Sequence, residues 1–430
     1  MALPYAGRVM TPLGRLRRAA IDVEPLRHVD FRRLWLGNSL GMVGFQLTAV
    51  AVPVQVFELT GSSFWVGMLG LVGLVPLVAF GLWGGAVADA VDRRLLLLGS
   101  SLLLWACTGG LLAASLLGLA SLPLLLGLVA VQAAGFAVAS STRGAIVPRV
   151  LPEPLVPAAN TLSFTAANVA MVAGPLLAGL ILARWSFATA YAADLAVFTV
   201  ALYAALRLPP LPPIGQATVP GLRSVVDGLA FIATRPVLLL SFAVDIAAMV
   251  LAMPRALFPE TAATLGGRGA VGWLYAAIAI GAVLAGLSSG WIGRVRRQGV
   301  ALVGAVIGWG LAVAAAGLVQ ALWLMVALLA VAGAADLVSA VYRQTILQTY
   351  APDEMRGRMQ GVFIVVVAGG PRLGDLRAGT TAAALGATIS WVGGGLLAAA
   401  LVSLALLVPA LRNYDARAPH PEAEEATSPP

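Results

Sequence analysis

The chain has 430 residues, of which 60% are hydrophobic and only 11% are charged. A soluble domain carries about 25% charged residues, so this composition excludes an ordinary soluble protein. A membrane-spanning helix needs roughly 20 apolar residues, which leaves room for about a dozen spans with short loops. The net charge of +8 does not indicate nucleic-acid binding, because the arginines are scattered between apolar runs. We therefore expect a lipid bilayer, and no nucleic acid, among the partners.

Few residues are available for metal or covalent chemistry. The single cysteine, Cys107, lies in an apolar run, which excludes an intrachain disulfide and a thiolate metal cluster. His28 and His420 lie in polar flanks and cannot form a proton relay inside a membrane. The chain also lacks a nucleophile–histidine pair and a phosphate-binding loop. We expect no enzyme, no catalytic residue, no metal site and no cofactor.

Twelve apolar runs of spanning length follow one another along the chain. Six lie near residues 34–57, 64–88, 95–119, 122–142, 160–183 and 186–206, and six near 236–258, 270–293, 299–319, 321–341, 360–383 and 389–411. Between the two sets, a proline cluster at 209–213 stops a helix. The segment after it has apolar residues at helical spacing, which predicts an amphipathic helix lying at the membrane surface.

This pattern predicts an all-α membrane protein with twelve transmembrane helices in two six-helix bundles. The expected parts are an N-terminal cytoplasmic segment at 1–33, a first bundle at 34–207, a linker with the amphipathic helix at 208–235, a second bundle at 236–412 and a disordered cytoplasmic tail at 413–430. Arginine is abundant in the loops of one side, whereas the other side has only Arg184, Arg255 and Arg268. Because cytoplasmic loops carry the excess of arginine, we expect both termini in the cytoplasm. One missed or false span would instead separate the termini.

One charged segment occurs twice. Arg143 and Ile146 fall 200 positions before Arg343 and Ile346, and the following Pro-acid pairs at 152–153 and 352–353 keep the same spacing. A second match relates residues 84–94 to residues 289–297. Such similarity between halves of an apolar chain is typical of a transporter built from two related bundles.

The second span ends in a loop whose charged residues can change partners between two conformations. A glycine that permits close helix contact, Gly85, is followed by Asp89 and by Arg93 and Arg94. An acid that meets a helix end or an arginine in one conformation and releases it in another can form a latch. This loop resembles the signature loop of the major facilitator superfamily, with departures at positions 90 and 92. We interpret it, together with Arg143 and Arg343, as cytoplasmic gating loops; the alternative is that these charges only stop a span and set topology.

Proline and glycine interrupt two later spans. Gly174-Pro175 lies in the fifth span and Gly370-Pro371 in the eleventh, and we expect both pairs to bend their helices. The first pair is similar to the Gly-Pro motif of the superfamily's exporters, although plain kinked helices also carry such pairs. The arginine that drug antiporters place in span four is Val131 here, so their proton-coupling residue cannot be assigned.

Five further segments extend the resemblance over nearly the whole chain: 31–35, 51–55, 208–213, 272–277 and 344–358. They are similar to the bacterial enterobactin exporter group. The resemblance implies a monomeric, multi-pass protein of the bacterial cytoplasmic membrane that exports a siderophore, driven by the proton gradient, by alternating access. Related multidrug efflux branches share the pattern, so multidrug efflux stays an alternative. A non-transporting receptor or scaffold is a more remote one.

Six ionisable residues fall inside the expected spans: Asp194, Asp245, Asp336, Arg372, Asp375 and Arg377. Each costs about 2.5–3.5 kcal/mol in mid-bilayer unless it has a partner or a wet cavity. A span interrupted by glycine and proline near the midplane indicates a transporter binding site. We therefore predict that Arg372, Asp375 and Arg377 line the central cavity beside a helix break at 369–371.

For the proton, Asp245 and Asp336 are the preferred candidates, and Asp194 is a further one. The alternative is that the charges form fixed ion pairs, Arg372 with Asp375 and Arg377 with Asp336, that only hold the bundle together. The six residues sum to a charge of −2, which favours a cationic substrate over an anionic siderophore. The two arginines can still hold an anion locally.

Overall fold

The structure, a computed structural model, describes residues 22–212, 222–350 and 356–415. Within these ranges every regular element is helical. The first half holds six long helices, with short 3₁₀ turns at Glu24–Arg27 (η1) and Glu153–Leu155 (η2). They are α2 (Val29–Thr60), α3 (Ser63–Ala90), α4 (Arg93–Leu116), α5 (Leu122–Val150), α6 (Val156–Arg184) and α7 (Phe187–Leu206).

The second half follows a short helix, α8 (Leu222–Ala233), which forms where the amphipathic segment was expected and packs against α14. Its long helices are α9 (Pro236–Ala252), α11 (Arg268–Leu287), α12 (Gln298–Ala316), α13 (Leu322–Tyr350), α14 (Arg356–Leu385) and α15 (Ala387–Ser403). The shorter elements are η3 (Arg255–Leu257), α10 (Phe258–Leu265), η4 (Ser289–Arg294), η5 (Leu404–Leu407) and α16 (Pro409–Arg412).

Local sequence explains several helix ends. Gly61 ends α2 in the left-handed region, with φ of +61°, which a residue with a side chain rarely adopts. Asp92 caps α4 by accepting a hydrogen bond from the Arg94 backbone N–H at 2.8 Å. Ser186 caps α7 by accepting from the Thr189 backbone N–H. The connections from α2 to α3, from α3 to α4 and from α6 to α7 are only two residues long.

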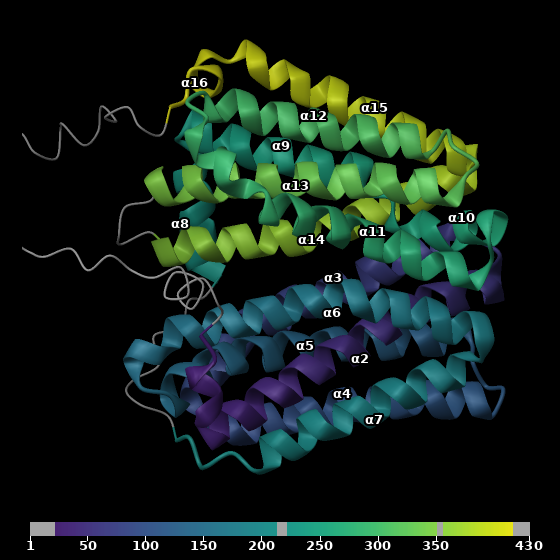
Figure 1. The fold of residues 1–430 in the computed structure, drawn as a ribbon, viewed down its shortest axis with the longest axis vertical. Helices are drawn as coiled ribbons and strands as arrows, with labels where there is room; N and C mark the ends of the chain where they lie inside the picture. The colour runs from purple at the N-terminus through teal and green to yellow at the C-terminus, as the bar shows by residue number, and fades with distance from the viewer. Residues whose placement is uncertain (1–21, 213–221, 351–355, 416–430) are drawn as a thin grey trace, which may run out of the picture.

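Eleven helical segments of the described chain are long and apolar enough to cross a membrane. Helix α14 has the length, with 30 residues, but its charges keep it outside that set. Within α2–α7 and within α9–α15 the helices lie side by side, forming the two groups of Figure 1. The chain is thus a multi-pass membrane protein.

The two halves repeat at a constant spacing. Helices α5, α6 and α7 begin at residues 122, 156 and 187, and α13, α14 and α15 begin at 322, 356 and 387. This offset of 200 puts Gly174 opposite Gly374. The Gly-Pro pairs of the two halves are therefore not at equivalent positions, since Gly370-Pro371 lies one turn earlier in its helix.

The expected helix break is also in a different place. Helix α14 runs without interruption through Pro371, whereas the chain breaks between α9 and η3, at Met253 and Pro254. A proline removes a backbone donor and clashes with the preceding turn, which explains the break at Pro254. Pro371 is tolerated beside Arg372, whose guanidinium donates to the Ala368 carbonyl at 2.6 Å.

The two groups of helices meet along α3 with α14 and along α6 with α11. Glycines set the approach: a Cβ on Gly70 would lie 2.9 Å from the Arg372 carbonyl oxygen, and one on Gly179 would lie 2.7 Å from Gly272 Cα. We call these contacts the seam. Such small residues let membrane helices pack backbone to backbone.

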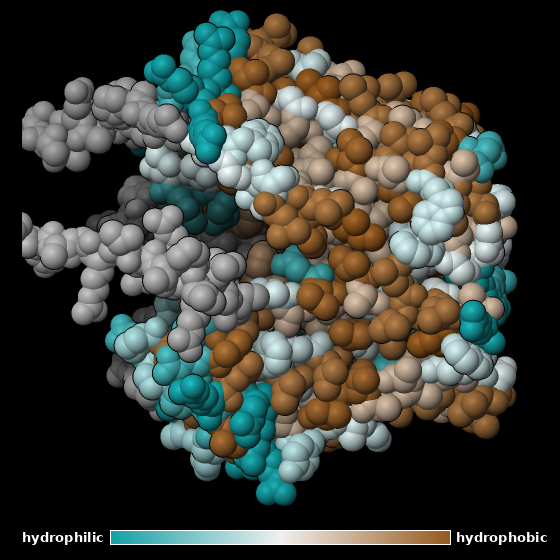
Figure 2. All heavy atoms as spheres, viewed as in Figure 1, coloured by the Kyte–Doolittle hydropathy of each residue, from teal (hydrophilic) through white to brown (hydrophobic). Residues whose placement is uncertain are grey.

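The seam lies towards one end of the molecule, which we call the closed end. There the Arg268 guanidinium of α11 binds the Glu58 carboxylate of α2 through two 2.6 Å contacts, and Ser63 of α3 donates to Glu260 of α10. The other end, called the arginine-rich end, includes Arg93, Arg294 and Arg412. There the space-filling view shows a hollow between the two groups, partly behind grey atoms (Figure 2).

Candidate functional site

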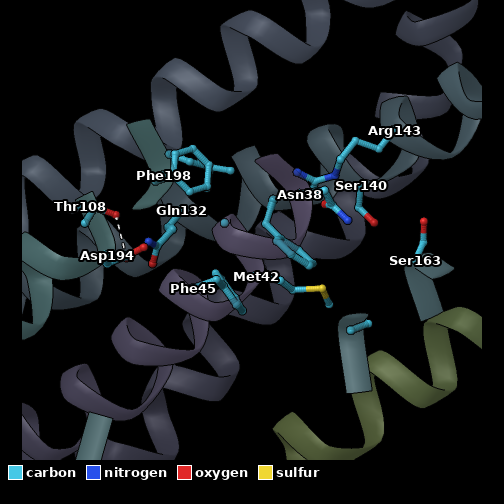
Figure 3. A pocket seen from close by; sticks show the side chains of 14 residues that line it. Asn38, Met42, Phe45, Thr108, Gln132, Ser140, Arg143, Ser163, Asp194 and Phe198 are labelled. Carbon is cyan, nitrogen blue, oxygen red and sulfur yellow. Dashed lines mark hydrogen bonds between the residues drawn. The ribbon is translucent and has the colours of Figure 1, made fainter. Parts of the chain in front are cut away.

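A cavity of about 240 Å³ lies in the first group of helices, between α2, α4, α5, α6 and α7 (Figure 3). It combines polar and aromatic side chains with two charged groups. Its lining residues are Asn38, Gly41, Met42, Phe45, Leu104, Thr108, Gln132, Phe136, Ser140, Arg143, Ser163, Ala167, Asp194 and Phe198.

Asp194, on α7, lies at one end of the cavity and is only 1% exposed. Its Oδ2 accepts hydrogen bonds from the Thr48 hydroxyl at 2.5 Å and from the Thr108 hydroxyl at 3.3 Å. Its Oδ1 accepts none from the described residues. A Cβ on Gly44 would collide with this Oδ1, so the glycine allows α2 to approach the carboxylate closely.

A chain of hydrogen bonds supports this end of the cavity. Tyr191, one turn before Asp194 on α7, donates to Gln55 Oε1 at 2.7 Å. Gln55 Nε2 in turn donates to the Ser115 hydroxyl at 3.2 Å. Because Gln55 belongs to α2 and Ser115 to α4, these bonds join α7, which carries Asp194, to the two helices that supply its hydrogen-bond donors.

Aromatic side chains form the middle of the cavity. The rings of Phe45 and Phe136 stack, with centroids 4.9 Å apart and planes inclined by 19°. Phe136 lies between Gln132 and Ser140 along α5, and both of these polar residues also line the cavity. A planar, amphipathic molecule can pack against the rings while its polar edge meets the amide and hydroxyl groups.

Arg143 lies at the other end of the cavity, 11 residues beyond Gln132 on α5, which is about 16 Å along an ideal helix. Among the described residues it has neither an ion pair nor a hydrogen bond. Sequence placed Arg143 and Arg343 in loops, but both lie inside helices. The helices continue past them because the next turns bury apolar residues such as Ile146 and Ile346.

Arg343, the equivalent residue of α13, has two acidic neighbours. It forms a buried ion pair with Asp245 of α9, with the two side chains 7% and 5% exposed. Its second terminal nitrogen lies 3.6 Å from Asp336 Oδ1. By the offset of 200, Asp336 corresponds to Phe136, so the first half has an aromatic ring where the second has a carboxylate. Arg343 is therefore neutralised within the protein, whereas Arg143 faces a cavity.

The charges of α14 satisfy backbone groups beside the break in the chain. Asp375 Oδ1 accepts from the Ala256 backbone N–H at 3.1 Å, at the start of η3. Arg377 donates to the Val250 carbonyl at 3.2 Å, near the end of α9, and to the Ser390 carbonyl at 3.1 Å. Such contacts supply partners that helix ends lack.

None of the three α14 charges lines the cavity of Figure 3. The described ion pairs also include neither Arg372 with Asp375 nor Arg377 with Asp336, the pairings considered from the sequence. These two pairings rest on the assumption that opposite charges close together on one helix, or on two neighbouring helices, form ion pairs. The broken backbone between α9 and α10 instead offers partners to Asp375 and Arg377, while Arg372 donates to the Ala368 carbonyl within α14.

The loop that resembles the superfamily signature is held to the end of α7. Arg94 donates to the Leu206 carbonyl at 2.8 Å, and Asp92 accepts from the Leu211 backbone N–H at 3.2 Å. Asp92, one of the departures from the family pattern, thus joins this loop to the segment after α7. The surroundings of Gly85 and the side chain of Asp89 lie outside what the structure describes.

Sequence reasoning overlooked most of this cavity. Only Asp194 was named as a site candidate, and Arg143 was assigned to gating. The sequence repeat that contains Arg143 and Arg343 could have indicated the site. Both arginines lie inside helices and belong in the count of interior charges. With them the interior has four aspartates and four arginines, a sum of zero rather than −2. The charge argument against an anionic substrate therefore fails.

Comparison with known proteins decides the family. The sequence profile of a family described as transmembrane secretion effector matches residues 20–428. The chain belongs to this family of the major facilitator superfamily. It is similar to the enterobactin exporter EntS of Escherichia coli and to that of Shigella boydii, with 30% identity over 93% of this chain and 96% of either relative.

Solved structures show that the fold is that of major facilitator transporters. The nucleoside transporter NupG aligns with a TM-score of 0.68 and 14% identity, covering 90% of this chain and 100% of NupG. A bacterial homolog to the human lysosomal transporter Spinster, in inward-facing and unoccupied conformation, aligns with a TM-score of 0.68 and 16% identity, covering 92% and 98%. The protein is a secondary transporter and not an enzyme.

Proposed function

We propose that this transporter is a proton-coupled exporter that moves a siderophore out of the bacterial cytoplasm by alternating access. In this proposal it acts as a monomer in the cytoplasmic membrane, needs no cofactor and takes its energy from the proton gradient. The observation that carries it is the cavity with Arg143 at one end and Asp194 at the other. The Arg143 guanidinium can hold an anionic substrate, and the Asp194 carboxylate can hold a proton.

The topology proposed here has twelve spans and cytoplasmic termini. Helix α14 is the twelfth span: its 30 residues are long enough, and the backbone partners of Asp375 and Arg377 offset the cost of burying those charges. The excess of arginine then assigns the arginine-rich end to the cytoplasm. Since the seam lies towards the opposite end, this conformation is accessible from the cytoplasm.

Alternating access requires the closed end to open. The groups there meet through glycine contacts and through the Arg268–Glu58 pair, whose side chains remain 39% and 37% exposed. The ion pair adds little to the cost of opening, because exposed ion pairs contribute only about 0–1 kcal/mol. Rocking of the two groups about the cavity would then present the substrate to the other side of the membrane.

The siderophore assignment draws on two observations. The relatives that cover nearly the whole chain are enterobactin exporters. The cavity adds Arg143, an arginine without a partner among the described residues, in the same lining as the stacked rings of Phe45 and Phe136. Guanidinium groups bind anionic oxygens through charge-assisted hydrogen bonds, and aromatic rings pack against planar groups.

Multidrug efflux is the second candidate function. The observation in its favour is Asp194, which lines the cavity and whose buried Oδ1 has no donor among the described residues. A cationic, amphipathic drug would supply that donor. Both candidates share the same fold and cavity, so only the transported compound separates them.

A deletion strain grown under iron limitation tests the two candidates together. The siderophore proposal expects siderophore to be retained in the cells, with unchanged sensitivity to a panel of cationic drugs. Normal siderophore secretion with raised drug sensitivity would instead support multidrug efflux. In a second test, purified protein in liposomes should move radiolabelled enterobactin when a pH gradient is imposed; no movement of enterobactin or of ethidium would contradict proton-coupled export.

A further inference from the structure

The four aspartates inside the expected spans differ in what surrounds them. Asp245 and Asp336 lie beside Arg343, and Asp375 accepts a backbone hydrogen bond at the start of η3. Asp194 is different, because its partners are two neutral hydroxyl groups. Among the described residues, Asp194 is also the only aspartate that lines the cavity of Figure 3.

We propose that Asp194 is the residue that binds and releases the coupled proton, and that Oδ1 is the atom that carries it. This inference rests on proton-coupled export as the function of the cavity. The inference selects Asp194 from the four aspartates inside the expected spans as the carrier of the proton. It also places the proton and the substrate in the same cavity of the first group of helices.

The surroundings of Asp194 make a change of protonation possible. Among the described residues no arginine pairs with it, so its charge is not held by a fixed cation. The helices packed against it offer Thr48 from α2 and Thr108 from α4, neither of which titrates. A carboxylate that is buried without a cation can exist both as the acid and as the anion, whereas the buried ion pair with Arg343 favours the charged form of Asp245.

Three further titratable or charged groups lie nearby. Tyr191 precedes Asp194 on α7, and its hydroxyl donates to Gln55. Cys107 is buried on α4, next to Thr108. Arg143 faces the same cavity from α5, at its far end. Helix α6 contributes Ser163 and Ala167 to the cavity, and neither is charged.

The hydrogen bonds identify the oxygen. Both threonine hydroxyls donate to Oδ2, while Oδ1 accepts nothing from the described residues. Uptake therefore forms an O–H bond at Oδ1 with a proton from water on one side of the membrane. Release breaks that bond and returns the proton to water on the other side, and no other reactant is consumed.

The same helix connects this site to the closed end. Helix α2 supplies Thr48 and Gly44 at the carboxylate, and Glu58, which pairs with Arg268, lies 10 residues beyond Thr48, about 15 Å along an ideal helix. A change of charge on Asp194 alters its bond to Thr48. Helix α2 is therefore the element through which protonation would bias opening of the closed end.

Transport by the full chain in liposomes provides the first test, with radiolabelled enterobactin as the probe. The wild type should show both counterflow without a gradient and uptake stimulated by a pH gradient. Asp194→Asn should keep counterflow and lose the stimulation. The matched control is Asp30→Asn, the same change at an exposed aspartate of the same half, which should keep both. Stimulation that persists in Asp194→Asn overturns the proposal.

A second test needs no transported compound. Infrared difference spectra of the purified protein in lipid, recorded as pH is varied, report the carbonyl stretch of a protonated carboxyl group. We expect such a band in the wild type and in Asp30→Asn, and its loss in Asp194→Asn. A band that survives in Asp194→Asn refutes the assignment of the proton. Because this result does not depend on enterobactin, it separates failure of the inference from failure of the proposed substrate.

A third variant leaves the carboxyl group in place, so it covers the case in which Asp194→Asn does not fold. Thr48→Val removes a donor to Oδ2 and so removes a contact that favours the anion. The carboxyl band and the gradient stimulation should then persist to higher pH than in the wild type. An unchanged pH profile of both signals in monodisperse Thr48→Val protein also contradicts the proposal.

Discussion

Arg143 and Arg343 occupy the same position in equivalent helices, yet only Arg343 lies beside acidic side chains. The buried pair with Asp245 ties α13 to α9 inside the second group of helices. In the first group the equivalent arginine faces a cavity, and Phe136 replaces the second acid. The two bundles are similar, but the arginine at this position has different roles in them. In the second bundle Arg343 is paired with acidic side chains and has a structural role, whereas in the first bundle Arg143 faces a cavity.

The Arg343 pair should therefore be important for stability. In Arg343→Gln the buried carboxylate of Asp245 loses its cation, and breaking a buried pair by removing one partner costs about 3–5 kcal/mol. Thermal unfolding in detergent measures the effect. The control is Arg268→Gln, which removes an exposed pair and should change stability by about 0–1 kcal/mol. Equal stability of the two variants would contradict a structural role for Arg343.

Arg143 should matter for binding and not for stability. Arg143→Gln removes a cation that has no acidic partner among the described residues, so the unfolding temperature should be unchanged. Loss of one hydrogen bond to a charged group, about 1.5–3 kcal/mol, should weaken binding of an anionic siderophore by roughly 10- to 150-fold. Equilibrium binding of enterobactin checks this. Arg143→Lys, which keeps the charge, should recover part of the affinity, and a tetraphenylphosphonium cation should bind Arg143→Gln as well as the wild type.

The sequence predicted the elements of this fold well, because the signals for them are local. Apolar runs, the proline cluster and the amphipathic segment located the helices, including α8 after the prolines. The predicted spans at 122–142 and 321–341 end too early, just before Arg143 and Arg343. The structure continues both helices for a further two turns, where Ile146 and Ile346 are fully buried.

The partners of the interior charges could not be predicted in the same way. Asp194 receives its hydrogen bonds from Thr48 and Thr108, which lie on two other helices far away in sequence. Which side chains meet depends on how each helix is rotated and where helices cross, and single-sequence patterns do not contain that information. The α14 charges show the same limit, because the break that they stabilise lies in a different helix.

Asp92 should stabilise the loop between α3 and α4. It caps α4 through the Arg94 backbone N–H and also accepts from the Leu211 backbone N–H. Asp92→Ala removes both contacts and should lower the free energy of unfolding by about 0.5–2 kcal/mol, the usual cost of losing an N-cap. Asp92→Asn keeps an acceptor oxygen and should retain most of the stability. Denaturant unfolding in detergent compares them, and equal stability of Asp92→Ala and the wild type would contradict the prediction.

The glycines of the seam should control which end of the transporter is open. A side chain at Gly70 would run into the backbone of α14 at Arg372, so Gly70→Leu should prevent the two groups from meeting at the closed end. Spin labels at Leu59 and Thr264, on α2 and α10 near that end, measure the separation. The single cysteine is buried Cys107, so Leu59→Cys and Thr264→Cys can be combined with Cys107→Ser without background labelling.

The expected result for Gly70→Leu is a longer distance between the labels, with the helical content unchanged. The matched control is Gly99→Leu, at a helical position where an added Cβ has open space around it and which lies outside the seam. That variant should keep the short distance. If Gly70→Leu also kept it, α3 and α14 would have to tolerate a leucine where their backbones are in close contact. The glycines would then not be what sets the contact between the two groups of helices.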